Sequence, residues 1–138
     1  MIRRAGPDDM ATVLEIRRVV FIDEQGVSEA EERDGHDHAA LHLIAFSESR
    51  PTGTARILIS DGTGKIGRVA VLQEHRGTGL GKALIRAALD ALSEVGAETA
   101  KLGAQTHAIG FYAALGFTPE GPEFLDAGIP HQLMVRSL

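Results

Sequence analysis

The residues with the clearest chemical meaning lie in a glycine-rich turn between a predicted strand and a predicted helix. The turn reads Arg76-Gly77-Thr78-Gly79-Leu80-Gly81-Lys82. Glycine lets the backbone turn tightly and approach a ligand with no Cβ in the way. A helix N-terminus adds unpaired N–H groups and the positive end of the helix dipole. Together these features predict a phosphate site, to which Arg76 and Lys82 add positive charge.

Two familiar glycine motifs do not fit this turn. A P-loop of the form GxxxxGK[ST] would need glycine in place of Arg76 and a hydroxyl in place of Ala83. A dinucleotide fingerprint needs GxGxxG, whereas the spacing here is GxGxG followed by Lys82. The pattern that fits is R-x-x-G-x-G, at Arg76, Gly79 and Gly81. The alternative is a glycine-rich turn that only packs.

Such a turn needs a strand before it and a helix after it. Apolar residues at helical spacing predict a helix from Leu80 that ends near Gly96, and the run 66–72 predicts the preceding strand. The other expected elements are strands over 2–4, 39–46, 54–60, 100–104 and 131–135, a turn over 49–53, and helices over 7–26 and 107–115. Hairpins followed by a strand–helix–strand unit predict a mixed sheet in a layered α/β (α+β) domain.

Composition predicts one ordinary folded domain over residues 1–138. Hydrophobic residues make up 43% of the chain, and cysteine is absent, which excludes a disulfide scaffold, a thiolate metal site and a cysteine nucleophile. The formal net charge is −5 without a basic stripe, so no nucleic-acid partner is expected. No apolar run approaches the ~20 residues that span a bilayer, so no membrane association is expected. The N-terminus lacks the pattern of a secretory signal, so a cytoplasmic location is expected.

The glycine-rich turn and its flanking elements resemble the acetyl-CoA motif Q/R-x-x-G-x-G/A of the GNAT N-acetyltransferases. The resemblance implies that the N–H groups of this turn hold the diphosphate of coenzyme A. It also implies that the preceding strand, at Val69, Ala70 and Val71, carries a bulge, splays from the next strand and pairs with the pantetheine arm. The expected fold is therefore the GNAT type, a mixed, mostly antiparallel sheet flanked by helices and splayed at this strand.

A second segment supports the same resemblance. Residues 105–117 are similar to the family pattern N-x-x-A-x-x-[LF]-Y-x-x-x-G-F, with Gln105 in place of the asparagine. This implies that Gln105, Phe111 and Tyr112 contact coenzyme A. The segments VFIDEQGV and DAGIPHQLM are similar to the ElaA-like branch of the family, so the resemblance covers nearly the whole chain.

Acyl transfer from a thioester to an amine makes three chemical demands. The amine must lose a proton, the carbonyl oxygen needs hydrogen-bond donors as negative charge develops on it, and the departing thiolate needs a proton. The resemblance implies direct attack in a ternary complex, with Tyr112 as the acid and the Val71 N–H as the oxyanion donor. Alternatively, Tyr112 only packs beside Phe111 and Phe117.

The base is open at this point. The candidates are Glu24 in an acidic segment, His107 at the start of the tyrosine-bearing helix, and His131 in a Gly-Ile-Pro-His turn. Histidine suits proton removal at neutral pH because its ordinary pKa is near 6.5. Each candidate also has a structural interpretation: a solvated or capping Glu24, His107 near a helix N-terminus, and His131 hydrogen-bonded at a strand edge. Water is the other candidate proton carrier.

Charge patterns leave the acceptor open. Seven carboxylates lie between residues 23 and 37 against the single base Arg33, which predicts either a solvated loop or a mouth that attracts an amine. Arg56 and Arg68 on neighbouring strands either face outward or favour an anionic acceptor. The histidines at 36, 38 and 42 lack a supporting ligand set, so no metal site is expected.

The sequence therefore predicts an N-acetyltransferase that uses acetyl-CoA and acts on a primary amine of a small molecule or protein. The alternatives are a catalytically silent CoA-binding sensor or interaction module, and a phosphate-binding protein without acyl chemistry. A homodimer is an expectation from the resemblance alone.

Overall fold

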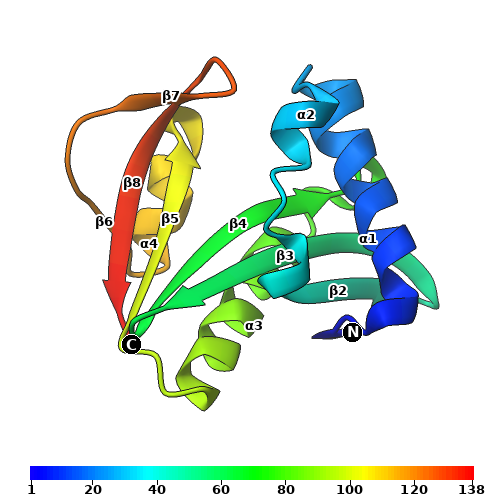
Figure 1. The fold of residues 1–138 in the computed structure, drawn as a ribbon, viewed down its shortest axis with the longest axis horizontal. Helices are drawn as coiled ribbons and strands as arrows, with labels where there is room; N and C mark the ends of the chain where they lie inside the picture. Colours follow the sequence, from blue (N-terminus) through cyan, green and yellow to red (C-terminus); the bar gives the residue numbers. More distant parts are fainter.

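The chain forms one sheet with helices on both faces (Figure 1), and the structure, a computed structural model, describes residues 1–138. The strands are β1 (Ile2–Arg4), β2 (Leu41–Ser47), β3 (Arg50–Ser60), β4 (Thr63–Val71), β5 (Thr99–Gln105), β6 (Thr118–Pro119), β7 (Phe124–Asp126) and β8 (Ile129–Ser137). The α-helices are α1 (Met10–Arg17), α2 (Glu29–Glu32), α3 (Leu80–Glu94) and α4 (Ile109–Ala114). Helix α1 continues as the π-helical turn η2 (Arg18–Glu24), and 3-10 turns form η1 (Pro7–Asp9), η3 (Asp37–Ala39), η4 (Gln73–His75) and η5 (Thr106–Ala108).

The strand order is β1-β2-β3-β4-β5-β8-β6, with β7 paired to β8. Every pair is antiparallel except β4 with β5. Helix α3 supplies the crossover between these two strands, as a parallel pair requires. The mixed, mostly antiparallel sheet of the predicted fold class is confirmed.

The two parallel strands separate partway along their length. Pairing between β4 and β5 covers only residues 63–66 and 99–102. Beyond this point β4 stays paired to β3, while β5 stays paired to β8, so the strands diverge in Figure 1. We call this opening the fork. It leaves the β5-facing edge of residues 67–71 without a strand partner, as the predicted splay requires.

A β-bulge lies on the fork side of β4. Thr54 pairs with Ala70 and Arg56 with Gly67, so Arg68 and Val69 together face one residue of β3. Arg68 has a φ of +49°, a conformation that a side chain with a Cβ adopts at a cost. The bulge was expected in the 69–71 segment, and it begins one residue earlier.

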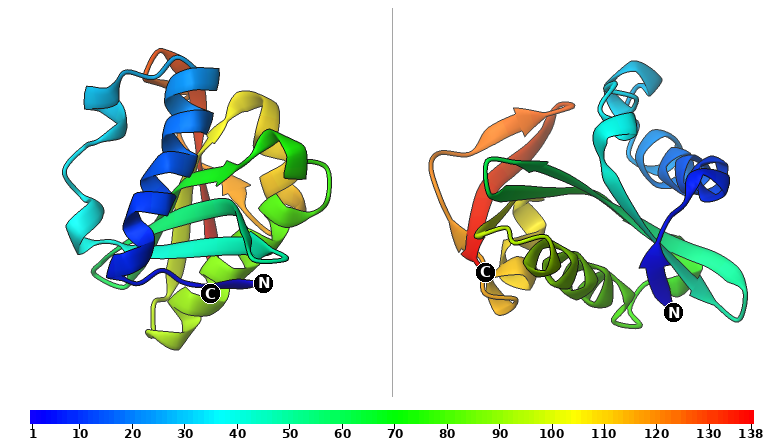
Figure 2. Two further views of the ribbon diagram at one scale, coloured as in Figure 1. Left: turned by 90° about the vertical axis from the view of Figure 1, so that its right-hand side faces the viewer. Right: turned by 60° about the horizontal axis from the view of Figure 1, so that its bottom comes forward.

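Helices cover both faces of the sheet (Figure 2). Helix α1 packs on β3 and β4 from one side, and α3 packs on β2, β3 and β4 from the other, where α4 also lies. The main core lies between the sheet and α3, which contributes Leu84, Ile85, Ala88, Leu89 and Leu92. A smaller cluster of Ile16, Val20 and Ala70 lies under α1. Both cores hold β4 from opposite faces and fix the strand that borders the fork.

Three predicted boundaries are wrong. The turn expected over 49–53 is a tight turn at Glu48 and Ser49, and β3 begins at Arg50. Pro51 is tolerated inside this strand because the register shifts beside it. Strand β4 begins at Thr63 rather than at residue 66, since residues 63–65 already pair with both β3 and β5. Gly64 is a packing residue in this stretch, because a Cβ there would overlap the side chain of Leu92.

The N-terminal helix predicted over 7–26 is not one regular α-helix. It runs as a 3-10 turn, an α-helix and a π-helical turn before it ends at Gly26, which has a φ of +72°. The remaining strands and helices are confirmed in type, with ends displaced by a few residues. None of the helices combines the length and the apolar composition of a membrane span.

Candidate active site

The glycine-rich turn presents a row of unused backbone donors. Gly77 and Gly79 have φ values of +77° and +84°, so both need the left-handed freedom of glycine. The amides of residues 77–82 donate to no protein acceptor, and the first helical bond runs from Ala83 N to Gly79 O at 3.0 Å. Six successive N–H groups thus lie without protein acceptors at the positive end of a 15-residue helix, an arrangement that favours a bound anion.

Gly81 differs from the other two glycines of the turn. Its φ is not positive, and an added Cβ would meet only Phe111 Cζ at an ordinary 3.8 Å. Neither backbone conformation nor packing within the chain therefore explains glycine at this position.

The Arg76 side chain is committed to the protein. Its Nε donates to Val71 O at 2.9 Å, and its Nη2 forms an ion pair with Glu24 at 2.8 Å. Arg76 thus ties the turn to the end of β4 and to η2 rather than extending freely as a phosphate ligand. Lys82 has no ion-pair partner in the structure.

Val71 directs its main chain into the fork. Leu72 N donates to Thr52 O at 2.9 Å, which makes Gly53 and Val71 a non-hydrogen-bonded pair across β3 and β4. The N–H and C=O of Val71 therefore point away from β3, and its carbonyl accepts from Arg76 on that side. The Val71 N–H is a donor on the strand edge that the fork exposes.

Tyr112 lies on α4 in an aromatic cluster. Its ring makes edge contacts with Phe111 and Phe117 at centroid distances of 5.0 and 6.0 Å. Burial raises the pKa of the Tyr112 hydroxyl above its ordinary value of 10.0. A pKa above 10 keeps the hydroxyl protonated at neutral pH, and the hydroxyl makes no hydrogen bond within the protein. This position is compatible with both roles that the sequence left open for Tyr112, packing beside Phe111 and Phe117 and donating a proton.

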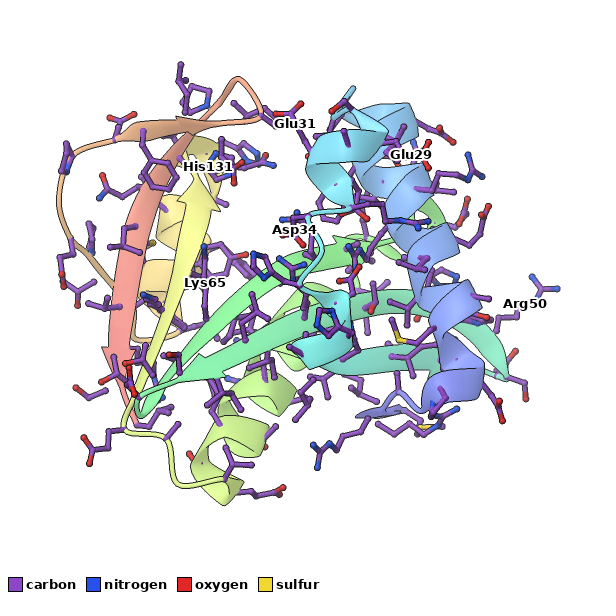
Figure 3. The ribbon with its side chains drawn as sticks, viewed as in Figure 1. Glu29, Glu31, Asp34, Arg50, Lys65 and His131 are labelled. Atoms are coloured by element: carbon purple, nitrogen blue, oxygen red, sulfur yellow. The ribbon has the colours of Figure 1, made fainter.

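A cavity of about 670 Å³ lies beside the fork. Its walls come from the segment around α2, from the middle of β3 and β4, from β5, and from the β7–β8 turn. Figure 3 shows His131 on one side of this opening and Glu31 and Asp34 on the other. Tyr112, Gln105, His107 and Val69 are among the lining residues, whereas Glu24 and the glycine-rich turn are not.

Two of the predicted site residues belong to a hydrogen-bonded chain across the cavity. His107 Nε2 lies 2.9 Å from Gln105 Oε1, and Gln105 Nε2 donates to Gln25 Oε1 at 3.1 Å. This chain joins β5 to the end of η2 at the open end of the fork. The structure thus brings Tyr112, Gln105 and His107 together, and it places Glu24 apart from them at Arg76.

Part of the acidic segment is bound to arginines of the protein rather than solvated. Three of its carboxylates, Glu32, Asp34 and Asp37, are paired with three arginines, Arg17, Arg56 and Arg68, and we call these six residues the charge network. Its centre is dry, since the side chains of Arg17 and Glu32 are each 1% exposed.

Each arginine of the charge network bridges a different element to the acidic segment. Arg17 Nε donates to Glu32 at 2.8 Å from α1, and Arg56 on β3 binds both oxygens of Asp34 at 2.8 Å. Arg68 Nε, at the bulge, donates to Glu32 at 2.7 Å. The network therefore holds the α2 wall of the cavity against the sheet.

The charge network also perturbs its carboxyl groups. Hydrogen bonds from Arg56 hold the pKa of Asp34 far below its ordinary value. Burial opposes ionisation of Asp37, but hydrogen bonds and charge from Arg17 and Arg56 outweigh it, so its pKa is also lowered. The sequence left open whether Arg56 and Arg68 face outward or favour an anionic acceptor. In the structure both line the cavity, and both are paired with carboxylates of the protein.

Comparison with known proteins identifies the family. Residues 11–138 match the family model described as "Acetyltransferase (GNAT) domain". The chain belongs to the GNAT acetyltransferase family. It is 38% identical over 122 residues to the uncharacterized N-acetyltransferase YjcF of Bacillus subtilis, which covers 88% of this chain and 87% of that protein.

Solved structures of GNAT proteins show the same fold. The crystal structure of Escherichia coli ElaA is 29% identical and superposes with a TM-score of 0.85, covering 99% of both chains. An acyl-CoA N-acyltransferase from Pseudomonas aeruginosa is 28% identical with a TM-score of 0.86, covering 99% of this chain and 97% of that one. Both the predicted family and the predicted class of enzyme, an acyltransferase, are thereby confirmed.

Proposed function

We propose that this GNAT protein is an acetyl-CoA-dependent N-acetyltransferase that acts on a primary amine by direct attack in a ternary complex. The observation that carries the proposal is the row of six unpaired amides at residues 77–82, which lies next to an open strand edge. Unpaired main-chain donors are costly to bury without a partner and favourable where an anion binds. The name of the Pseudomonas relative supports an acyl-CoA as the donor.

The donor would occupy two features in succession. Its diphosphate fits the amides of the glycine-rich turn, and its pantetheine arm fits the exposed edge of β4 at Val69, Ala70 and Val71. The amides of the pantetheine arm would replace the hydrogen bonds that β4 loses where β5 diverges. Gln105 and Phe111, on the opposite side of the fork, would complete the contact.

The chain offers groups for two of the three chemical demands. The Val71 N–H would stabilise the developing negative charge on the thioester oxygen. The Tyr112 hydroxyl would give its proton to the departing sulfur, and its raised pKa keeps that proton available at neutral pH. The proposal needs no covalent enzyme intermediate, and the whole of residues 1–138 would act as one catalytic domain.

Calorimetric titration tests the donor site directly. We expect coenzyme A to bind more tightly than ATP, since only coenzyme A carries a pantetheine arm for the β4 edge. Gly79→Glu would place a carboxylate and its bulk where the diphosphate binds, and it should abolish CoA binding.

The chain supplies a matched control for this variant. Gly96 lies just beyond the opposite end of α3, has a left-handed φ of +79°, and has open space around it, like Gly79. Gly96→Glu should therefore cost similar backbone strain and leave CoA affinity unchanged. Equal affinity of both variants for CoA would refute the site. CoA binding without thiol release from acetyl-CoA, with every amine supplied, would favour a silent CoA-binding module.

A further inference from the structure

Across the cavity from α2, one histidine is held in a single orientation with one ring nitrogen free. We propose that His131 is the proton acceptor that deprotonates the amine. This inference rests on the proposed N-acetyltransferase function. It concerns removal of the proton from the amine, the one chemical demand that Tyr112 and Val71 do not meet.

The first observation is the tautomer. His131 Nδ1 lies 2.6 Å from Ile129 O. A carbonyl oxygen can only accept a hydrogen bond, so Nδ1 carries the hydrogen. In the neutral ring the lone pair is therefore on Nε2, which is the atom able to take a proton.

The second observation is the placement of the ring. His131 stacks on Phe124 at a centroid distance of 5.7 Å and an interplanar angle of 24°. The residue is 8% exposed and lies on β8 between β5 and β7, yet it lines the cavity. Nε2 makes no hydrogen bond in the protein. His42 Nδ1 is buried away from solvent without a partner, whereas His131 Nε2 is not. The ring is thus held by two contacts at the cavity wall, with Nε2 left without a protein partner.

The other base candidates lack this combination. Glu24 is bound to Arg76 and does not line the cavity. His107 also has one ring nitrogen held, with Nε2 2.9 Å from Gln105 Oε1, but the residue is exposed and, unlike His131, its ring stacks on no aromatic side chain. His36 lines the cavity but is exposed and has no contact that orients its ring.

The charges around the cavity favour an ammonium near this ring. Among the lining carboxylates, Glu31 on α2 and Asp126 on β7 make no ion pair, whereas Glu32 and Asp34 are neutralised by the charge network. The lining cations are Arg56, Arg68 and Lys65, the first two paired. The two free carboxylates would attract a cationic acceptor, and His131 would remove its proton.

The proton balance closes over one turnover. The ammonium gives one proton to His131 Nε2, and the lone pair so released forms the nitrogen–carbon bond. As the carbon–sulfur bond breaks, the nitrogen loses a second proton to water and the sulfur receives one from Tyr112. Water then restores the tyrosine proton and removes the one on His131, so the products are an amide, a free thiol and one net proton.

Steady-state kinetics of the full-length chain with acetyl-CoA test this role. The probe amines are ethanolamine, spermidine, glucosamine 6-phosphate and Nα-acetyl-lysine. We expect His131→Gln to lower kcat ~100-fold, the lower end of general-base effects, with CoA affinity within about threefold of wild type. Imidazole should restore part of the activity of His131→Ala. The control His38→Ala, an exposed histidine outside the cavity, should match wild type.

A kcat of His131→Gln within threefold of wild type would overturn the proposal. So would a loss of kcat that imidazole does not restore in a variant whose melting temperature has fallen. Nitrogen-15 NMR gives a readout independent of the acceptor: we expect the neutral form of the His131 ring to carry its hydrogen on Nδ1, and the opposite tautomer would refute the assignment. Failure of the wild-type protein to acetylate any probe would count against the proposed function instead.

Discussion

The charge network should contribute much of the stability of the α2 wall, and Glu32→Ala tests this. The substitution removes the carboxylate that joins Arg17 to Arg68, at 2.8 and 2.7 Å. It leaves Arg17, whose side chain is 1% exposed, with Asp37 as its only side-chain partner. Removing one member of a buried ion pair costs about 3–5 kcal/mol, because the other charge remains buried.

This cost converts into a large change in melting temperature. The entropy of unfolding is about 2.1 cal/mol/K per residue, or roughly 290 cal/mol/K for a chain of this length. A loss of about 3–5 kcal/mol then lowers the melting temperature by roughly 10–17 °C. Calorimetry or circular dichroism can measure a shift of this size easily.

Glu29→Ala is the matched control because Glu29 is an exposed carboxylate on the same short helix and has no ion-pair partner. Its loss should cost under about 1 kcal/mol. Hydrogen exchange should also accelerate over residues 28–40 in Glu32→Ala and not in Glu29→Ala. Equal melting temperatures for the two variants would refute the argument that the network holds this wall.

Two further perturbations act on the candidate site and on its charges. Tyr112→Phe should lower kcat by ~100-fold or more while CoA affinity and melting temperature stay near wild type, because the hydroxyl has no protein partner; equal losses of turnover and binding, measured by thiol release and calorimetry, would make the residue a packing group. The pKa values of Asp34 and Asp37 are lower in the folded chain than their ordinary 3.8, so the unfolded chain binds more protons as pH falls. The stability they contribute is therefore complete above about pH 5 and lost as pH falls below 4; circular dichroism melts should show a weaker pH dependence in Asp34→Asn than in Asp90→Asn, an exposed control.

Local sequence rules predicted the parts of the site that depend on local backbone physics. Gly77 and Gly79 stand out in the sequence because a strand-to-helix turn needs left-handed residues, and both have positive φ. The bulge and the fork were predicted from the family resemblance, because the residue types of β4 do not themselves indicate either feature. Gly64 has no local signal, because its role is set by Leu92, which lies 28 residues later on α3.

Pairing across long sequence distances explains what the sequence did not reveal. Glu32 counted as one of seven carboxylates in a polar segment, yet it is 1% exposed between arginines 15 residues before and 36 residues after it. Nothing in the local pattern distinguishes it from Glu29 or Glu31. The free Nε2 of His131 likewise depends on a carbonyl contact and on stacking, which a linear sequence does not show.

One residue connects the two sides of the proposed reaction. Arg68 occupies the bulge of β4 with a left-handed φ, and the same side chain holds Glu32 and the carbonyls of α2. The bulge sets where Val69 and Val71 point along the open strand edge, while the ion pair sets where α2 lies over the cavity. A non-glycine residue tolerates this backbone only where surrounding contacts compensate for the strain. The buried charge network supplies those contacts, and the position of the proposed donor strand and that of the proposed acceptor wall therefore depend on each other.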